Sequence, residues 1–167
     1  MPDVTFRNWE IKDFPQVISL LMKTWSAAYS SFIPQEDLDS YLGQTYSLEK
    51  LSELYNNKNV ICFLVEVNDK VAGWLKLIIN ETENRFYLSS LYVLPEYQKL
   101  KIGKELIDIS FKTAKDFGFN EIWIGVMENN TKAFEWYRKL GFEFIKELPF
   151  TMGKTTVNHL IGVKKLV

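Results

Sequence analysis

Hydrophobic residues recur at helical spacing in the first third of the chain. From Asp13 to Ser31 they stand three or four positions apart, at Ile18, Leu21, Met22, Trp25 and Tyr29. Asp13 can cap this helix, and Pro15 suits its first turn. A second helical region is expected over residues 35–41 and 48–55, broken at Gly43. The pattern therefore predicts amphipathic helices before the first long strand.

The pattern changes to strands in the middle of the chain. Residues 60–67 and 71–79 are rich in β-branched and aromatic side chains. The pair Asn68-Asp69 between them favours a tight hairpin turn. Residues 86–93 form a third strand beyond a polar turn. These three segments predict an antiparallel meander.

Helical periodicity returns after Pro95. A helix is predicted over residues 101–117, with Gly118 as its stop, and a strand follows over residues 121–126. A strand, a helix and a strand of these lengths require a crossover connection and a parallel strand pair. The sheet is therefore expected to be mixed.

The last part of the chain predicts one more helix and two strands. Asn129 or Asn130 caps the helix, which ends at Gly141. The strands cover residues 142–150 and 156–163.

Length and charge limit the class of protein. The 167 residues, 47% of them hydrophobic, suit a single domain over 1–167. Twenty basic and 21 acidic residues give a net charge of −1, without the basic excess typical of nucleic-acid binding. No segment approaches the roughly 20 apolar residues of a membrane span, and the N-terminus has no signal-peptide pattern. We expect a cytoplasmic protein that binds neither nucleic acid nor membrane.

Cysteine and histidine each occur once. Cys62 lies in an apolar run, where a buried and inert thiol is expected, and it has no partner for a disulfide within the chain. His159 alone cannot form a histidine metal cluster. We therefore expect no metal site and no Cys–His catalytic pair.

A basic loop joins the third strand to the helix that follows. The first turn of a helix has N–H groups without intrahelical acceptors and carries partial positive charge, so it can bind a pyrophosphate. Lys99, Lys101 and Lys104 add full charges at this point. The alternative is an ordinary helix start with solvated lysines.

Two motifs in this region occur together. The loop reads Gln98-Lys99-Leu100-Lys101-Ile102-Gly103, close to the pattern Q/R-x-x-G-x-G/A. One helix and one strand later, Asn130 is followed by Ala133, Tyr137 and Leu140-Gly141-Phe142. In this combination the chain resembles the GCN5-related N-acetyltransferase (GNAT) superfamily over nearly its whole length. The resemblance implies an α/β (α+β) fold with a mixed, mostly antiparallel seven-stranded sheet flanked by helices and splayed between the fourth and fifth strands.

The same resemblance implies acetyl-CoA as cosubstrate and assigns residues to it. The backbone of Leu91, Tyr92 and Val93 would pair with the pantetheine arm like an added strand. The pyrophosphate would be bound by the loop residues Gln98, Lys99, Leu100, Lys101, Ile102, Gly103 and Lys104. Asn130 would hydrogen-bond the arm, and Tyr137 would lie near the sulfur as catalytic acid. A plain helix cap for Asn130 and core packing for Tyr137 are the alternatives.

One position departs from the family pattern. Lys101 stands where the motif has its first glycine. We expect a helical φ at Lys101, because lysine then adds an ammonium group to the phosphate site without backbone strain.

The implied chemistry requires a proton acceptor. An amine with a pKa near 10 is mostly protonated at neutral pH. The fourth-strand positions Tyr87, Ser89 and Ser90 offer no good base. Glu128 is the nearest carboxylate in sequence, although a solvated surface role is equally consistent. The base is left unassigned, and ordered water is expected to serve.

The acceptor is predicted to be a small amine. The run 148–153, with Trp25 and Tyr29, looks like the bacterial spermidine/spermine N-acetyltransferase subgroup, which makes Trp25, Tyr29 and Phe150 candidate substrate contacts. Glu36, Asp37 and Asp39 either guide a polycation or form a solvated acidic face.

Two other functions remain open at this stage. One is acetylation of protein N-termini. The other is a non-catalytic acyl-CoA sensor, against which the presence of Tyr137 argues. The resemblance also allows a homodimer.

Overall fold

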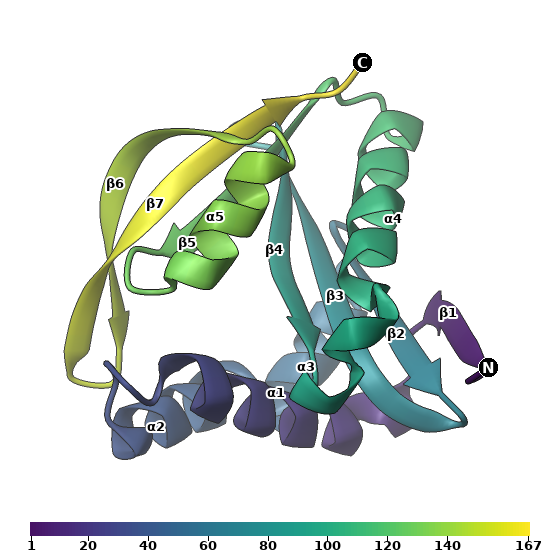
Figure 1. Cartoon of the computed structure of the whole chain (residues 1–167), viewed down its shortest axis with the longest axis vertical. Coiled ribbons are helices and arrows are strands. Elements are labelled where there is room, and N and C mark those ends of the chain that lie inside the picture. The colour runs from purple at the N-terminus through teal and green to yellow at the C-terminus, as the bar shows by residue number, and fades with distance from the viewer.

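A seven-stranded sheet organises the chain (Figure 1). The computed structural model describes residues 1–167. The strands are β1 (Val4–Asn8), β2 (Val60–Val67), β3 (Lys70–Asn80), β4 (Arg85–Val93), β5 (Glu121–Met127), β6 (Glu143–Met152) and β7 (Thr155–Lys165). Their order is β1-β2-β3-β4-β5-β7-β6, and only β4 and β5 are parallel. This confirms the expected fold class. The hydrophobic pattern missed β1, a short edge strand.

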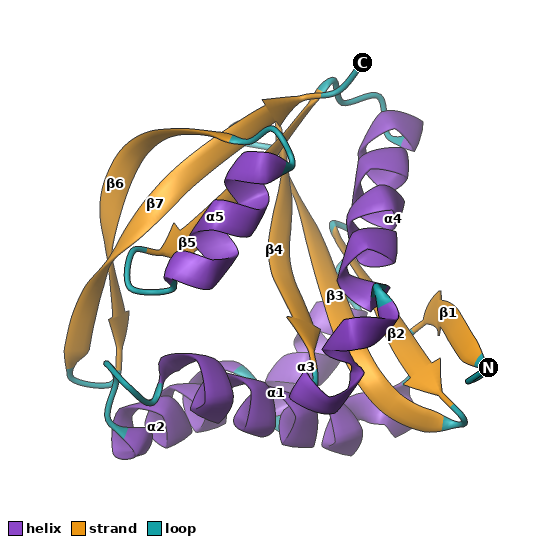
Figure 2. Ribbon diagram, viewed as in Figure 1, coloured by secondary structure: helices purple, strands orange, loops and turns teal.

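Helices cover both faces of the sheet (Figure 2). They are α1 (Phe14–Tyr29), α2 (Gln35–Thr45), α3 (Leu48–Tyr55), α4 (Ile102–Asp116) and α5 (Thr131–Lys139), with short 3₁₀ helices η1 (Ile11–Asp13) and η2 (Pro95–Leu100). One core joins α1–α3 to Leu64 and Trp74 on the sheet. A second core joins α4 and Tyr137 of α5 to the opposite face, around Leu75 and Phe86. No helix is long and apolar enough to span a membrane.

The parallel strands β4 and β5 separate soon after they meet. They pair only at Tyr87 and Trp123, whereas β3 pairs with β4 up to Val93. Figure 1 shows the two strands diverging from this point. Ser89 forms a bulge in β4, because the register with β3 shifts between Lys76 and Leu77. The β4 edge that faces β5 is therefore unpaired beyond the bulge.

The break between α2 and α3 lies later than predicted. We expected it at Gly43, but α2 continues through this glycine to Thr45. One glycine costs a helix only about 1 kcal/mol, and the burial of Leu38 and Leu42 offsets that cost. The real boundary is Ser47, whose Oγ accepts the Lys50 N–H at 3.2 Å.

Glycine and asparagine positions in the turns agree with the sequence pattern. Asn68 and Asp69 both have positive φ, 49° and 64°, as a tight hairpin requires. Gly118 and Gly141, with φ of 84° and 98°, follow α4 and α5 as predicted.

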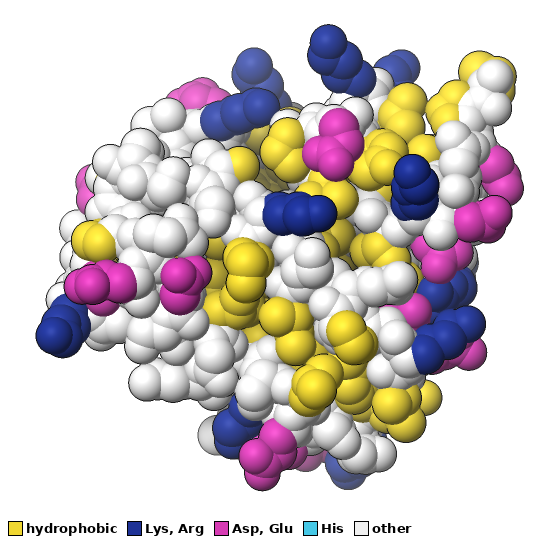
Figure 3. All heavy atoms as spheres, turned by 90° about the horizontal axis from the view of Figure 1, so that it is seen from below, with side chains coloured by type: hydrophobic (Ala, Val, Ile, Leu, Met, Phe, Trp, Pro, Cys, Tyr) yellow, Lys and Arg dark blue, Asp and Glu magenta, His cyan; other side chains and the backbone are white.

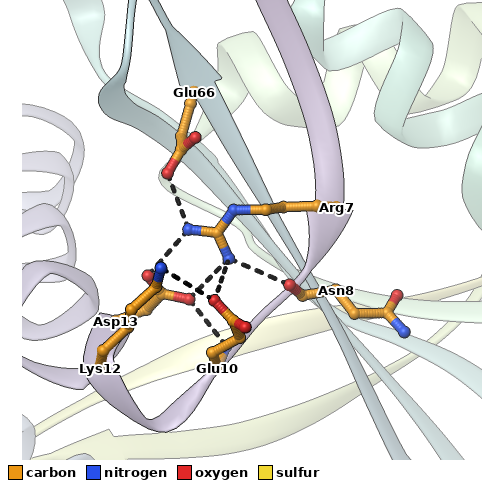
Figure 4. Close-up of polar contacts among 6 residues, drawn as sticks. All are labelled: Arg7, Asn8, Glu10, Lys12, Asp13 and Glu66. Atoms are coloured by element: carbon orange, nitrogen blue, oxygen red, sulfur yellow. Dashed lines mark hydrogen bonds and ion pairs between the residues drawn. The ribbon is translucent and has the colours of Figure 1, made fainter.

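Asp13 does not cap α1 as expected; it binds Arg7 of β1 instead (Figure 4). The guanidinium donates to both Asp13 carboxylate oxygens at 2.8 and 2.9 Å and to Glu66 Oε1 at 2.7 Å. Asp13 also accepts the Glu10 N–H at 2.7 Å. Burial alone would raise the pKa of Asp13, but the hydrogen bonds from Arg7 and the Glu10 N–H outweigh it and lower the pKa. The contact ties the edge strand to the start of α1.

We predict that Asp13→Asn lowers the free energy of unfolding at pH 7 by about 1–3 kcal/mol, because it leaves Arg7 without its bidentate partner. The native pKa of Asp13 lies below its unfolded value near 4, so this stabilisation is present above about pH 4 and is lost as pH falls through the native pKa. Urea unfolding at pH 7 and pH 3 should show the difference from wild type shrinking in acid.

Asp116→Asn is the matched control, because Asp116 forms an exposed pair with Lys112. It should change stability by less than about 0.5 kcal/mol. Equal losses in both variants, or a loss in Asp13→Asn that does not depend on pH, would contradict the assignment.

Candidate active site

The basic loop forms a cationic helix start beside the gap between β4 and β5. η2 ends at Leu100, and α4 begins at Ile102. In the first backbone hydrogen bond of α4, the Glu105 N–H donates to the Lys101 carbonyl at 3.3 Å. The N–H groups of Ile102, Gly103 and Lys104 precede it, so they have no intrahelical acceptor. Lys99, Lys101 and Lys104 are exposed here.

The expectation of a helical φ at Lys101 was wrong. Lys101 has φ 60° and ψ 19°, the left-handed conformation that glycine adopts most easily. The chain passes from one helix directly into another at this residue, and a single left-handed residue produces that change of direction. The lysine therefore occupies a strained backbone position.

Gly103 serves a different purpose from the missing glycine. Its φ is not positive, and a Cβ at this position would approach the Trp136 indole at 3.4 Å. This is an ordinary van der Waals distance, so the position has room for a methyl group. The structure therefore agrees with a motif that allows glycine or alanine at this position.

Polar contacts connect the loop to its neighbours. Gln98 Nε2 donates to the Val93 carbonyl at 3.2 Å, which fixes the loop on the end of β4. Lys132 Nζ of α5 lies 3.5 Å from Gln98 Oε1 and adds a cation that the loop motif did not reveal. Lys104 Nζ binds Asp108 at 2.5 Å, so its ammonium group would exchange this partner for a phosphate.

Asn130 and Tyr137 both belong to α5, on the other side of the gap. Asn130 Oδ1 accepts the Ala133 N–H at 3.3 Å, so the residue is a helix cap and its amide NH₂ remains free for a ligand. Tyr137 is 8% exposed. Burial raises the pKa of Tyr137 well above its ordinary value, and the Tyr29 hydroxyl adds to the rise. Tyr137 therefore stays protonated at neutral pH.

An aromatic layer, made of Trp25, Tyr29, Tyr41, Tyr92 and Phe150, covers the α1 side of the sheet next to the gap. The Trp25 ring lies 5.8 Å from Tyr41 and 6.3 Å from Tyr92, and Phe150 lies 5.6 Å from Tyr41. The three predicted substrate residues thus share one layer. Trp25 and Tyr29 are buried in it, whereas Phe150 is half-buried.

Asp37 is neither a free polycation guide nor a solvated acid. Its carboxylate accepts the Lys154 N–H at 3.0 Å and the Thr155 hydroxyl at 2.5 Å. These bonds fasten α2 to the turn between β6 and β7, and the bond from Thr155 is the main cause that lowers the Asp37 pKa. Glu36 and Asp39 are exposed.

The candidate bases considered from the sequence lie in different surroundings. The Tyr87 hydroxyl donates to Glu83 at 2.8 Å at the paired end of β4. Ser89 is exposed on the bulge, and Ser90 is buried opposite Lys76. Glu128 is exposed and accepts from Asn158 Nδ2 at 3.2 Å. No cluster of His, Cys, Asp or Glu side chains is suited to hold a metal ion.

Cys62 and Lys76 face each other in the core. Burial raises the pKa of the Cys62 thiol to about 12, which fits the expected inert thiol. Lys76 is 6% exposed, donates to the Tyr46 hydroxyl and lies 4.6 Å from the Tyr46 ring centroid. No pattern in the sequence predicted this buried cation.

We predict that Lys101→Gly raises the free energy of unfolding by up to about 1 kcal/mol, because glycine removes the strain of a left-handed lysine. Lys101→Ala is the matched control: it removes the same charge but keeps a Cβ at the strained position. Urea unfolding should place the glycine variant above the alanine variant. The reverse order would show that the loop does not strain the lysine.

Comparison with known proteins identifies the family of this chain. The model of the acetyltransferase (GNAT) family matches residues 14–142. A spermidine N(1)-acetyltransferase of Thermoplasma acidophilum is 30% identical over 84% of this chain and 88% of its own length. An uncharacterized N-acetyltransferase of Lactobacillus delbrueckii subsp. lactis is 24% identical over 93% of this chain and 94% of its own.

A solved structure shows the same fold with a ligand. It is the PaiA N-acetyltransferase of T. acidophilum in complex with coenzyme A, with a TM-score of 0.84 and 26% identity over 98% of this chain and 99% of that chain. The family match, the acetyltransferase relatives and the splayed sheet agree, and this chain belongs to the GNAT family of acetyl-CoA-dependent N-acetyltransferases.

Proposed function

We propose that the enzyme acetylates a primary amine of a polyamine such as spermidine or spermine. The observation that carries this proposal is the 30% identity to a spermidine N(1)-acetyltransferase over most of both chains. The aromatic layer supports it, because aromatic faces can pack the methylene chain and hold an ammonium group. Figure 3 views the end of the molecule that carries α1 and α2, where charges of both signs are scattered rather than gathered into one patch.

The residues present fit acetyl-CoA. The free N–H groups of Ile102, Gly103 and Lys104, with the exposed lysines beside them, suit a pyrophosphate. The unpaired edge of β4 at Leu91–Val93 suits an arm that binds as an added strand. The bound cosubstrate supplies the thioester that makes acetyl transfer favourable.

Tyr137 is proposed as the proton donor to the departing sulfur. It lies on α5, on the α4 side of the sheet, where burial keeps its hydroxyl protonated. A thiolate with a pKa near 8.5 leaves fairly well without help, so the donor's contribution is moderate.

The experiment that tests the proposed acceptor is a thiol-release assay with acetyl-CoA and a panel of amines. We predict the highest kcat/KM with spermidine or spermine, above peptides with free N-termini and above aminoglycosides. Equal or higher kcat/KM with peptides would shift the assignment to protein N-terminal acetylation. Binding of acetyl-CoA without thiol release from any amine would indicate a sensor.

We predict that Tyr137→Phe lowers turnover by roughly 10- to 10³-fold while acetyl-CoA still raises the melting temperature, because the phenyl ring keeps the packing and lacks only the hydroxyl group that donates the proton. Rapid-quench measurement of the acetyl-transfer step separates chemistry from product release. Tyr55→Phe is the matched control, because it removes the same atom from an exposed tyrosine on α3 and should keep the wild-type transfer rate. An unchanged transfer rate in Tyr137→Phe would make Tyr137 a packing residue.

A further inference from the structure

The centre of the sheet is open to solvent at one place on the α1 side. Gly125 lies in the middle of β5, yet it is exposed. Ser89, on the bulge of β4, is also exposed, although β4 is a central strand. These two positions belong to the two strands that separate. Solvent therefore reaches the gap between β4 and β5 from the face opposite α4.

The imidazole of His159 lies over this opening. His159 is on β7, paired with Met127 of β5, and a Cβ at Gly125 would approach its Nδ1 at 3.1 Å. Its ring stacks on Phe150, with centroids 4.2 Å apart and an interplanar angle of 1°. Neither ring nitrogen has a hydrogen-bond partner within the chain. Stacking therefore fixes the ring and leaves its nitrogens to a water molecule or a ligand.

The surroundings of His159 favour the neutral imidazole. Burial is the cause that lowers the pKa of His159. Its strand partners Met127 on β5 and Leu148 on β6 are apolar. The strand registers put three further titratable residues on the face of the sheet that carries His159. These are Lys146 of β6 and, across the opening, Arg85 and Tyr87 of β4. Tyr41 of α2 contacts Phe150, which separates it from His159, and burial raises the pKa of Tyr41.

The nearby carboxylates are engaged elsewhere. Glu128 accepts from Asn158, and Asp37 accepts from Lys154 and Thr155. Glu83 accepts from Arg85 and Tyr87. None of them accepts a hydrogen bond from His159. The imidazole is therefore the one side chain at the opening that is neutral and able to accept a proton at neutral pH.

We propose that His159 is the general base of acetyl transfer, receiving the proton from the acceptor amine on the α1 side of the gap. This inference rests on the proposed function, and it fills the role left open by Tyr87, Ser89 and Ser90. The absence of a side chain at Gly125 lets the imidazole lie close against β5, at the edge of the gap where solvent enters.

The proton balance of the step is complete. The acceptor ammonium first loses one proton to solvent water. The neutral amine nitrogen then attacks the thioester carbonyl carbon and forms the new N–C bond. His159 takes one proton from this nitrogen as its positive charge develops. The C–S bond breaks, its electron pair leaves with the sulfur, and Tyr137 donates a proton to that sulfur. The imidazolium then returns a proton to the tyrosinate through water, which restores both residues.

The test compares His159→Gln and His159→Phe with wild type in single-turnover acetylation of spermidine from pH 5 to 9. Glutamine keeps a polar group, and phenylalanine keeps the stack on Phe150. We expect the rate to fall roughly 10- to 100-fold in both variants. The wild-type acidic inflection should match the NMR titration of the single histidine, below about pH 6.5. Both variants should lose this inflection and still show an acetyl-CoA-induced rise in melting temperature.

Glu128→Gln is the matched control for the competing carboxylate, and its rate and inflection should equal those of wild type. A wild-type rate and pH profile in both His159 variants would overturn the proposal for His159 alone, as would a rate loss confined to Glu128→Gln. Failure of wild type to acetylate any amine would refute the proposed function, and the proposal for His159 with it.

Discussion

The separation of β4 from β5 is the constraint on which the site depends. Two parallel strands that stayed paired would satisfy each other's backbone groups and close the sheet. Here the pairing stops at Tyr87 and Trp123, so β4 presents an unpaired edge on its way to the basic loop. The two faces of the sheet carry separate hydrophobic cores, with Tyr29 in the core on the α1 side and Tyr137 in the core on the α4 side.

Contacts at both ends hold this open geometry. At the paired end, the Arg85 guanidinium lies 3.8 Å from the Trp123 ring centroid and bridges β4 and β5. At the far end, Asp37 fastens the turn between β6 and β7 to α2. The hairpin of β6 and β7 is thus anchored away from β4, and its position sets where Phe150 and His159 lie.

The fold was largely predictable because its signals are local. The β-branched and aromatic residues of β2 and β3, the Asn68-Asp69 turn and the two helices with their glycine stops can each be recognised within a few residues. The errors arose where distant contacts override local preference. Core burial carries α2 through Gly43, and Arg7 of β1 takes the carboxylate that would otherwise cap α1.

In the candidate site, too, the parts set by local sequence were predictable and the parts set by distant contacts were not. The loop and the α5 signature are contiguous motifs, so their positions followed from the sequence. The left-handed φ of Lys101 depends on how η2 meets α4, and the approach of Lys132 to Gln98 depends on how α5 packs. His159 is the one histidine of the sequence. Its contact with Gly125 arises only because β7 lies between β5 and β6 in the sheet.

Burial has opposite effects on the pKa values of the proposed acid, Tyr137, and the proposed base, His159. Loss of solvent disfavours the charged form of any group, which raises the pKa of a phenol and lowers the pKa of an imidazole. Tyr137 is therefore held as the protonated phenol and His159 as the neutral imidazole, the starting states that a donor and an acceptor need. No charged partner has to be placed beside either group.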